Sequence, residues 1–125
     1  MKKYTIQVVE DELALSNTIK DELTEEGFNV IQTFNGEEGF KKAKEEKPDV
    51  ILLDIIMPKI DGITMLKMLK ADVKTKYIPV IVLTVHGDLE KIADTITLGA
   101  EAYYIKDQQS LSEITKNIKN ILRIK

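Results

Sequence analysis

The sequence contains no cysteine, and this absence excludes both a disulfide framework and a thiolate metal site. It fits a reducing compartment. Long apolar runs are absent as well, since no stretch approaches the ~20 apolar residues that a membrane-spanning helix needs. The opening Met1-Lys2-Lys3-Tyr4 leads into a strand pattern without the apolar segment of a secretory signal peptide. We therefore expect a cytoplasmic protein without a membrane partner.

A clustered excess of basic residues is also lacking. The chain carries 18 lysine and arginine residues against 21 acidic ones, for a formal net charge of -3 at pH 7. A general nucleic-acid-binding protein needs a basic stripe to neutralise phosphates, so we expect no direct nucleic-acid partner. What is present, 43% hydrophobic and 31% charged residues over 125 positions, predicts one soluble globular domain.

Short apolar runs alternate with amphipathic segments along the whole chain. The runs predict five β-strands at residues 4–9, 28–33, 50–53, 80–83 and 102–105. Helical spacing predicts inward-facing side chains at Leu15, Ile19, Leu23, Phe40, Ala43, Ile63, Leu66, Leu69, Leu89, Ile92, Ile96, Leu111, Ile114, Ile118 and Ile121. This alternation indicates an α/β fold with a parallel sheet covered on both faces. The expected form is a five-stranded, doubly wound sheet of order 2-1-3-4-5 with five helices, although periodicity alone does not establish that order.

Turn and capping residues separate these segments. Gly27 and Gly99 are placed to end helices, and Asn35-Gly36 opens the turn into the second helix. Ser110, followed three residues later by Glu113, has the pattern of a capping box at the start of the last helix.

Polar side chains end four of the five predicted strands. They are Glu10 and Asp11 after the first strand, Asp54 after the third, Thr84 after the fourth and Lys106 after the fifth. Parallel strands end at one edge of the sheet, and neighbouring strands lie ~4.8 Å apart, so the expected order brings the three carboxylates within a few ångströms. Such charges repel one another at a partly desolvated edge. Either their pKa values rise or a cation binds there.

The chemistry of this set favours a phosphoryl acceptor. All the candidate ligands are hard oxygens, without histidine or cysteine, which favours Mg²⁺ over zinc. Thr84 can donate a hydrogen bond to an incoming phosphoryl oxygen, and Lys106 supplies a compact positive charge. Asp54, between metal and lysine, is then placed as a nucleophile toward phosphorus. The set suits formation of an aspartyl phosphate at Asp54.

Four segments carry a resemblance to a known family. They are Val9-Glu10-Asp11-Glu12, residues 52–58 (Leu-Leu-Asp-Ile-Ile-Met-Pro) with Asp61-Gly62, residues 79–84, and residues 99–106. Each segment alone is weak, but together, in this order and spacing, they resemble the response-regulator receiver domain, the CheY-like family of two-component signalling. The resemblance covers residues 4–123, which implies one receiver domain and no second domain.

The resemblance implies a role for each residue at the acidic edge. Asp54 would accept a phosphoryl group from the phosphohistidine of a sensor histidine kinase or a phosphotransfer protein. Asp11, Asp54 and the backbone carbonyl of Ile56 would bind Mg²⁺, with Glu10 assisting through water. Lys106 would contact the phosphoryl oxygens.

The resemblance also implies a switch. Thr84 would move toward the phosphoryl group, and Tyr103 would turn inward with it. The output would be a changed surface on the fourth helix, fifth strand and fifth helix, recognised by a downstream partner or used in a phosphorylation-linked homodimer. The protein would then be a signalling module and not an enzyme, with catalysis limited to its own phosphorylation and dephosphorylation.

Several positions depart from the family pattern. Glu10 stands where the family usually has aspartate, and Asp107 stands where a proline usually follows the lysine. Apolar Ile56 and bulky Val85 are expected to disfavour an attacking water and so to prolong the phosphorylated state. His86, the only histidine, is expected to be an exposed loop residue.

Three other functions are compatible with this fold class. A Mg²⁺-dependent phosphohydrolase would need a second acid two residues after Asp54, where Ile56 stands. A nucleotide or flavin binder would need a glycine-rich first loop, where Glu10-Asp11-Glu12-Leu13 stands. A docking domain that is never phosphorylated would not need the full acidic set. The chain is expected to be either a stand-alone receiver or part of a longer regulator.

Overall fold

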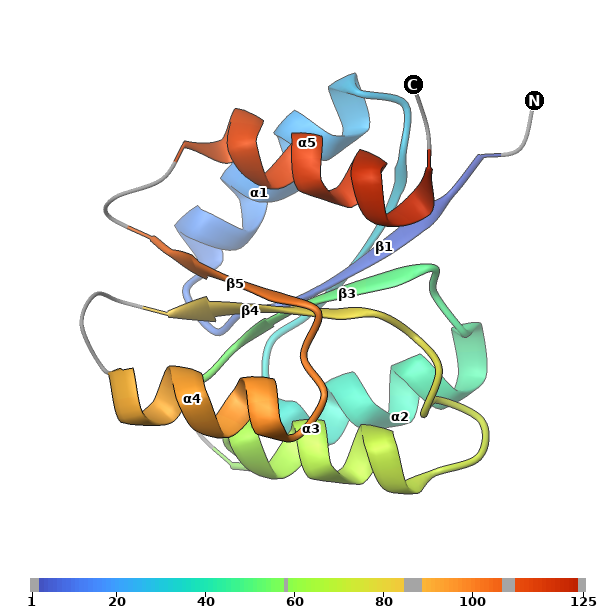
Figure 1. Ribbon diagram of the computed structural model, residues 1–125. Coiled ribbons are helices and arrows are strands. Elements are labelled where there is room, and N and C mark those ends of the chain that lie inside the picture. The colour runs from blue at the N-terminus through green and yellow to red at the C-terminus, as the bar shows by residue number, and fades with distance from the viewer. Residues whose placement is uncertain (1–2, 58, 85–88, 107–109, 124–125) are drawn as a thin grey trace.

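The computed structural model describes residues 3–57, 59–84, 89–106 and 110–123. Strands and helices alternate along these residues (Figure 1). In chain order they are β1 (Thr5–Val9), α1 (Leu13–Glu25), β2 (Asn29–Thr33), α2 (Gly36–Glu46), β3 (Val50–Asp54), α3 (Gly62–Ala71), β4 (Val80–Thr84), α4 (Leu89–Thr97), β5 (Ala102–Ile105) and α5 (Leu111–Leu122). Every predicted strand lies within one residue of its observed bounds.

The five strands form one parallel sheet of order β2-β1-β3-β4-β5, which confirms the predicted fold class. Helices α1 and α5 cover one face of this sheet, and α2, α3 and α4 cover the other (Figure 1). Because all strands run the same way, their carboxyl ends meet at one edge.

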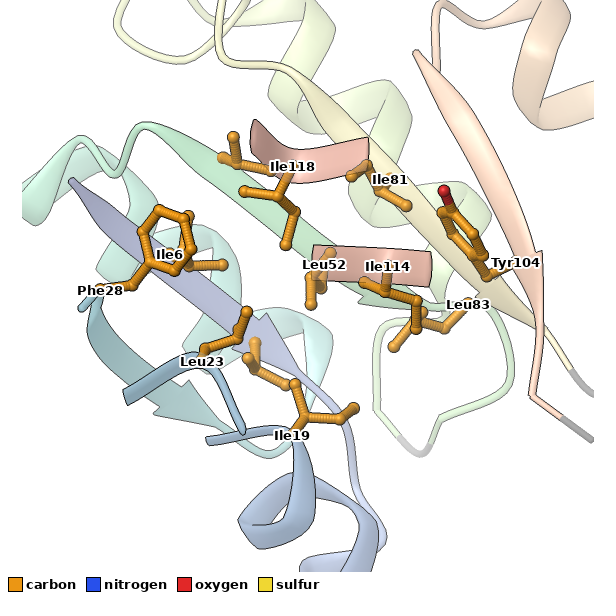
Figure 2. Packing of buried hydrophobic residues seen from close by; sticks show 12 residues of the cluster. Ile6, Ile19, Leu23, Phe28, Leu52, Ile81, Leu83, Tyr104, Ile114 and Ile118 are labelled. Carbon is orange, nitrogen blue, oxygen red and sulfur yellow. The ribbon is translucent and has the colours of Figure 1, made fainter. Parts of the chain in front are cut away.

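The core consists of two apolar layers, one on each face of the sheet. Residues of β3 alternate between them, since Leu52 packs in the layer under α1 and α5 whereas Leu53 packs in the layer under α2 and α3. Figure 2 shows the first layer, where Leu52 lies with Ile114 and Ile118 of α5. Both layers exclude solvent, which explains why β3 reads as an uninterrupted apolar run.

Capping residues begin the helices where the sequence places them. The Asn35 side chain accepts a hydrogen bond from the Glu38 backbone N–H at 2.8 Å, and that of Ser110 accepts one from the Glu113 N–H at 3.4 Å. Such caps each stabilise a helix by about 1 kcal/mol. Gly27 follows α1 with a φ of 93°, a left-handed conformation that glycine adopts without strain.

The prediction that Ile96 of α4 faces inward is wrong. Its neighbour one turn earlier, Ile92, is buried, but Ile96 is 45% exposed. Ile96 lines a surface hollow beside Tyr103 of β5. Because β5 is the last strand of the sheet, the flank of α4 that carries Ile96 has no further strand to pack against. The side chain of Leu89, also predicted inward, lies outside the described residues.

Candidate functional site

Four strands bring polar residues to the carboxyl edge of the sheet. Glu10 directly follows β1, Asp54 ends β3, Thr84 ends β4 and Lys106 directly follows β5. The β3–β4 register pairs Asp54 with Leu83, the residue before Thr84. The backbone N–H of Lys106 donates to the Thr84 carbonyl at 2.8 Å. The sheet itself therefore fixes the spacing of these backbones.

The ammonium of Lys106 contacts two carboxylates at this edge. Its Nζ lies 2.6 Å from Oε1 of Glu10 and 3.2 Å from Oδ1 of Asp54. The side chains are 17% exposed for Lys106, 1% for Glu10 and 5% for Asp54, so the ion pairs are largely shielded from water. Since β4 lies between β3 and β5, the long lysine side chain must reach past the end of β4 to make both contacts.

Three carboxylates form a cluster at the same edge. Glu10, Asp11 and Asp54 each offer an oxygen, and these oxygens lie within 4.8 Å of one another. Glu10 and Asp54 are buried, whereas Asp11 is exposed and keeps the cluster open to solvent. Carboxylate oxygens at this spacing suit a hard divalent cation that retains part of its water shell, which is the preference of Mg²⁺. The residues present therefore fit a divalent metal.

The charges in the cluster perturb one another. Burial, followed by the charge of Glu10, raises the pKa of Asp54 from 3.8 to about 7, although Lys106 opposes this shift. Burial alone would lower the pKa of Lys106, but hydrogen bonds and charges from Glu10 and Asp54 outweigh it and raise that pKa. The described site thus holds more negative charge than its lysine neutralises. A bound cation would favour the ionised form of Asp54.

The loop after β3 turns back tightly onto the end of that strand. The Gly62 N–H donates to the Ile55 carbonyl at 2.8 Å, and a Cβ at Gly62 would overlap the Asp54 carbonyl. The Asp61 side chain accepts a hydrogen bond from the Thr64 N–H at 2.8 Å and begins α3. The Asp61-Gly62 pair therefore holds the backbone beside Asp54 in one path.

Three further residues of the predicted site and switch differ in their exposure to solvent. Thr84 is buried at the end of β4, one strand away from Asp54. Ile56 lies in the loop after β3, and its side chain is 63% exposed. Tyr103 is 41% exposed and lines the same hollow as Ile96. The tyrosine ring is thus partly outside the core in this structure. Val85, His86 and Asp107 lie outside the described residues.

Sequence reasoning missed the direct contact between Glu10 and Lys106. It assigned Glu10 to a water-mediated metal contact and Lys106 to the phosphoryl group. In the structure the Glu10 carboxylate approaches the lysine more closely than Asp54 does. The longer side chain of glutamate at this position was the available signal, because it extends farther from β1 than aspartate would.

A parallel, doubly wound sheet with carboxylates and a lysine at its carboxyl edge defines a CheY-like signalling domain. The family model for the response regulator receiver domain matches residues 6–119. The chain belongs to that family, whose members are signalling phosphoacceptors of two-component systems.

Relatives and solved structures agree with this assignment. The alkaline phosphatase synthesis transcriptional regulatory protein PhoP of Bacillus subtilis is 37% identical over 119 residues, which are 94% of this chain and 48% of PhoP. A response regulator 1452 receiver domain from Francisella superposes with a TM-score of 0.88 at 26% identity, covering 97% of this chain and 98% of that one. The Vibrio cholerae chemotaxis protein CheY4 shares the fold, with a TM-score of 0.88 at 22% identity and coverage of 96% and 99%.

The chain spans about half the length of the curated relatives it matches. Within the described part of the chain, the helices are all too short or too polar to cross a membrane.

Proposed function

We propose that the protein is a phosphoacceptor switch, in which Asp54 receives a phosphoryl group from the phosphohistidine of a sensor histidine kinase or phosphotransfer protein. The observation that carries the proposal is the position of Asp54, which lies 3.2 Å from the Lys106 ammonium and within a cluster of three carboxylates. Glu10 shares the burial, the lysine contact and the neighbouring carboxylate oxygens, but its Oε2 already accepts a hydrogen bond from the Glu12 backbone N–H, which favours Asp54 as the acceptor.

In this proposal a carboxylate oxygen of Asp54 attacks phosphorus. The new O–P bond forms as the P–N bond to the donor histidine breaks, and its electron pair returns to the imidazole. Lys106 balances charge on the phosphoryl oxygens, and the Thr84 hydroxyl donates a hydrogen bond to one of them. Water later attacks phosphorus, breaks the O–P bond to Asp54, releases inorganic phosphate and restores the carboxylate, so catalysis is limited to the protein's own modification.

Mg²⁺ is the cofactor that the donor set favours. Glu10, Asp11, Asp54 and the backbone carbonyl of Ile56 would hold it. When bound, the ion would neutralise charge on the acids and on the phosphoryl oxygens. The burial of Asp54 supports a role for a bound cation, because the ionised carboxylate is disfavoured when Lys106 is the only positive charge beside it.

The output of the switch is proposed for the surface of α4, β5 and α5. Thr84 ends β4, and Tyr103 lies on the neighbouring strand, partly exposed in a surface hollow of ≈ 620 Å³. Movement of Thr84 toward the phosphoryl group would open space for the tyrosine ring and change this hollow. A downstream protein or effector domain, or a second copy in a phosphorylation-linked homodimer, would recognise the change. We place this receiver unit at residues 4–123, in the cytoplasm, with no direct nucleic-acid contact.

A phosphohydrolase acting on an external substrate is the competing function. It would use an acid two residues beyond its nucleophile, and in this chain that residue is Ile56, an apolar side chain exposed to solvent. The residues at the site therefore favour stable modification of the protein over repeated turnover of a substrate.

Acetyl phosphate with Mg²⁺ tests the proposal directly. The intact mass of the wild type should rise by one phosphoryl group, and this rise should be absent in Asp54→Ala and in the wild type treated with EDTA. Asp21→Ala, which removes an exposed acid from α1, serves as the matched control and should be modified like the wild type. Modification of Asp54→Ala to the wild-type extent would overturn the assignment.

A further inference from the structure

Gly36, the first residue of α2, lies against the loop that follows β3. The residue is buried, and a Cβ at this position would overlap the Ile60 carbonyl oxygen and lie 2.9 Å from the carbonyl carbon of Ile60. Even in close C–H···O contacts, the carbon and the oxygen stay about 3.3 Å apart. The start of α2 and the backbone of Ile60 can therefore meet in this way only because residue 36 has no side chain.

Backbone conformation does not explain the glycine at position 36. Among the described residues, the glycines with positive φ are Gly27 and Gly99, so Gly36 has a backbone that other residues adopt without strain. Glycine is also a poor helix former, so helix propensity does not favour it at the start of α2. The close approach of Ile60 is the feature that requires a glycine there.

Ile60 connects this contact to the backbone of Asp54. Gly62, two residues after Ile60, lies against the Asp54 carbonyl. Its N–H also donates a hydrogen bond to the Ile55 carbonyl at 2.8 Å. The loop thus has two close backbone contacts, one with α2 at Ile60 and one with β3 at Gly62. A displacement of Ile60 would reach Gly62 within two residues, and from there the end of β3.

We propose that Gly36 is a positioning residue, which lets the start of α2 set the path of the loop between β3 and α3 and so the backbone at Asp54. The inference rests on the proposed function for the purpose of this positioning, because the Ile56 carbonyl in the same loop is a proposed Mg²⁺ ligand. Helix α2 supplies no proposed ligand, and yet it takes part in the geometry of the site through Gly36.

Hydrogen exchange in EDTA tests the positioning without metal or phosphate. Gly36→Ala should displace Ile60 and weaken the hydrogen bond from Gly62 to Ile55. We expect the Gly62 amide to exchange about tenfold faster or more, relative to the Ile51 amide, which donates to the Pro79 carbonyl inside the sheet. A general loss of stability accelerates the amide in the sheet at least as much, so only a local effect raises this exchange ratio.

The affinity for Mg²⁺ gives the second measurement. Titration calorimetry on folded Gly36→Ala should show Mg²⁺ binding weakened by about tenfold or more, which is the usual effect of removing a group that holds a metal ligand in place. Loss of stability alone would not change the affinity at a temperature where the variant is fully folded.

Gly39→Ala is the matched control, because Gly39 is a second buried glycine of the same helix. A Cβ at Gly39 would meet side-chain atoms of Met65 and Val9 at 3.0 Å and no loop backbone. Met65 is unbranched and flexible, so it can move aside. We expect the exchange ratio and the Mg²⁺ affinity of Gly39→Ala to stay within about twofold of the wild type, whatever its stability.

A wild-type exchange ratio in Gly36→Ala, or a raised ratio with wild-type Mg²⁺ affinity, would overturn the inference. If Gly36→Ala does not fold, Ile60→Ala loosens the same loop from its own side, since Ile60 is partly buried against the layer under α2 and α3. It should raise the exchange ratio and weaken Mg²⁺ binding. Ile63→Ala truncates another partly buried residue of that layer, in α3, and should change neither. Equal effects of these two variants would count against the proposal.

Failure of the proposed function would look different. If the wild type binds no Mg²⁺ or acetyl phosphate does not label Asp54, the proposed cofactor or acceptor is refuted. The exchange ratio in EDTA depends on neither, and it alone would then decide whether Gly36 positions the loop.

Discussion

The carboxyl edge of the sheet and the apolar layer beneath α1 and α5 are built from residues of the same strands, yet they contribute oppositely to stability. In β3, Leu52 is buried among aliphatic side chains, whereas Asp54, two residues later, is buried among charges. Burying the leucine stabilises the fold, but burying the carboxylate costs free energy unless it is protonated or paired. The stability gained in the adjacent apolar layer therefore offsets the cost of burying the charged site.

Leu52→Ala should cause the largest change. The side chain is fully buried between the sheet and α5 (Figure 2), so its truncation leaves a cavity. We expect the free energy of unfolding to fall by about 2–5 kcal/mol, measured by urea denaturation. Modification by acetyl phosphate should survive at temperatures where the variant is folded. A loss below about 1 kcal/mol would mean that the layer repacks around the cavity and that Leu52 is not a main source of the stability that offsets the charged site.

The pH dependence of stability should be the next largest effect. Folded Asp54 keeps its proton up to about pH 7, whereas the unfolded carboxyl releases it near 3.8. Between these values the folded state binds more protons, so rising pH favours unfolding. In EDTA, the stability of the wild type relative to Asp54→Asn should fall by roughly 2–4 kcal/mol from pH 4 to pH 7 and then level off. If the difference in stability between the wild type and Asp54→Asn does not change with pH, Asp54 is already ionised at pH 4.

Asp54→Asn should stabilise the metal-free protein while abolishing phosphorylation. The substitution removes a buried negative charge, and Lys106 keeps its closer partner, Glu10. We expect the free energy of unfolding at pH 8 in EDTA to rise by about 1–3 kcal/mol. Asp21→Asn on the exposed face of α1 is the control and should change stability little. Destabilisation by Asp54→Asn would indicate that the ion pair between Asp54 and Lys106 stabilises the protein by more than burial of the carboxylate destabilises it.

Asp61→Ala should have the smallest effect of the four. It removes the side chain that caps α3, but it leaves the Gly62 hydrogen bond to Ile55 in place. We expect the free energy of unfolding, measured by urea denaturation, to fall by about 1 kcal/mol. Asn35→Ala at the start of α2 should lose a similar amount, although it lies in another loop. A much larger loss for Asp61→Ala would mean that the cap also holds the backbone at Asp54.

Much of this architecture follows from local sequence patterns. The uninterrupted apolar run of β3 and the polar residues that end the strands predicted both the sheet and the edge at which those residues gather. The order of the strands was expected from the common form of doubly wound sheets, because periodicity gives no information about which strands are neighbours.

The features that local sequence patterns did not predict depend on tertiary geometry. Ile96 fits a helical stripe, but its exposure depends on α4 lying over the last strand of the sheet. The Glu10–Lys106 contact joins side chains from β1 and β5, which are far apart in sequence and separated in the sheet by two other strands. The pKa of Asp54 likewise depends on how much water the finished edge admits, which residue identity alone does not specify.

The close approach of Gly62 to the Asp54 carbonyl has a consequence for protein engineering. An acceptor aspartate grafted onto another parallel sheet would need the returning loop as well as the strand, because any larger residue at the glycine would push the backbone off its path. The transferable unit is therefore the continuous segment from β3 to Gly62, and its tolerance of insertions should be far lower than that of ordinary surface loops.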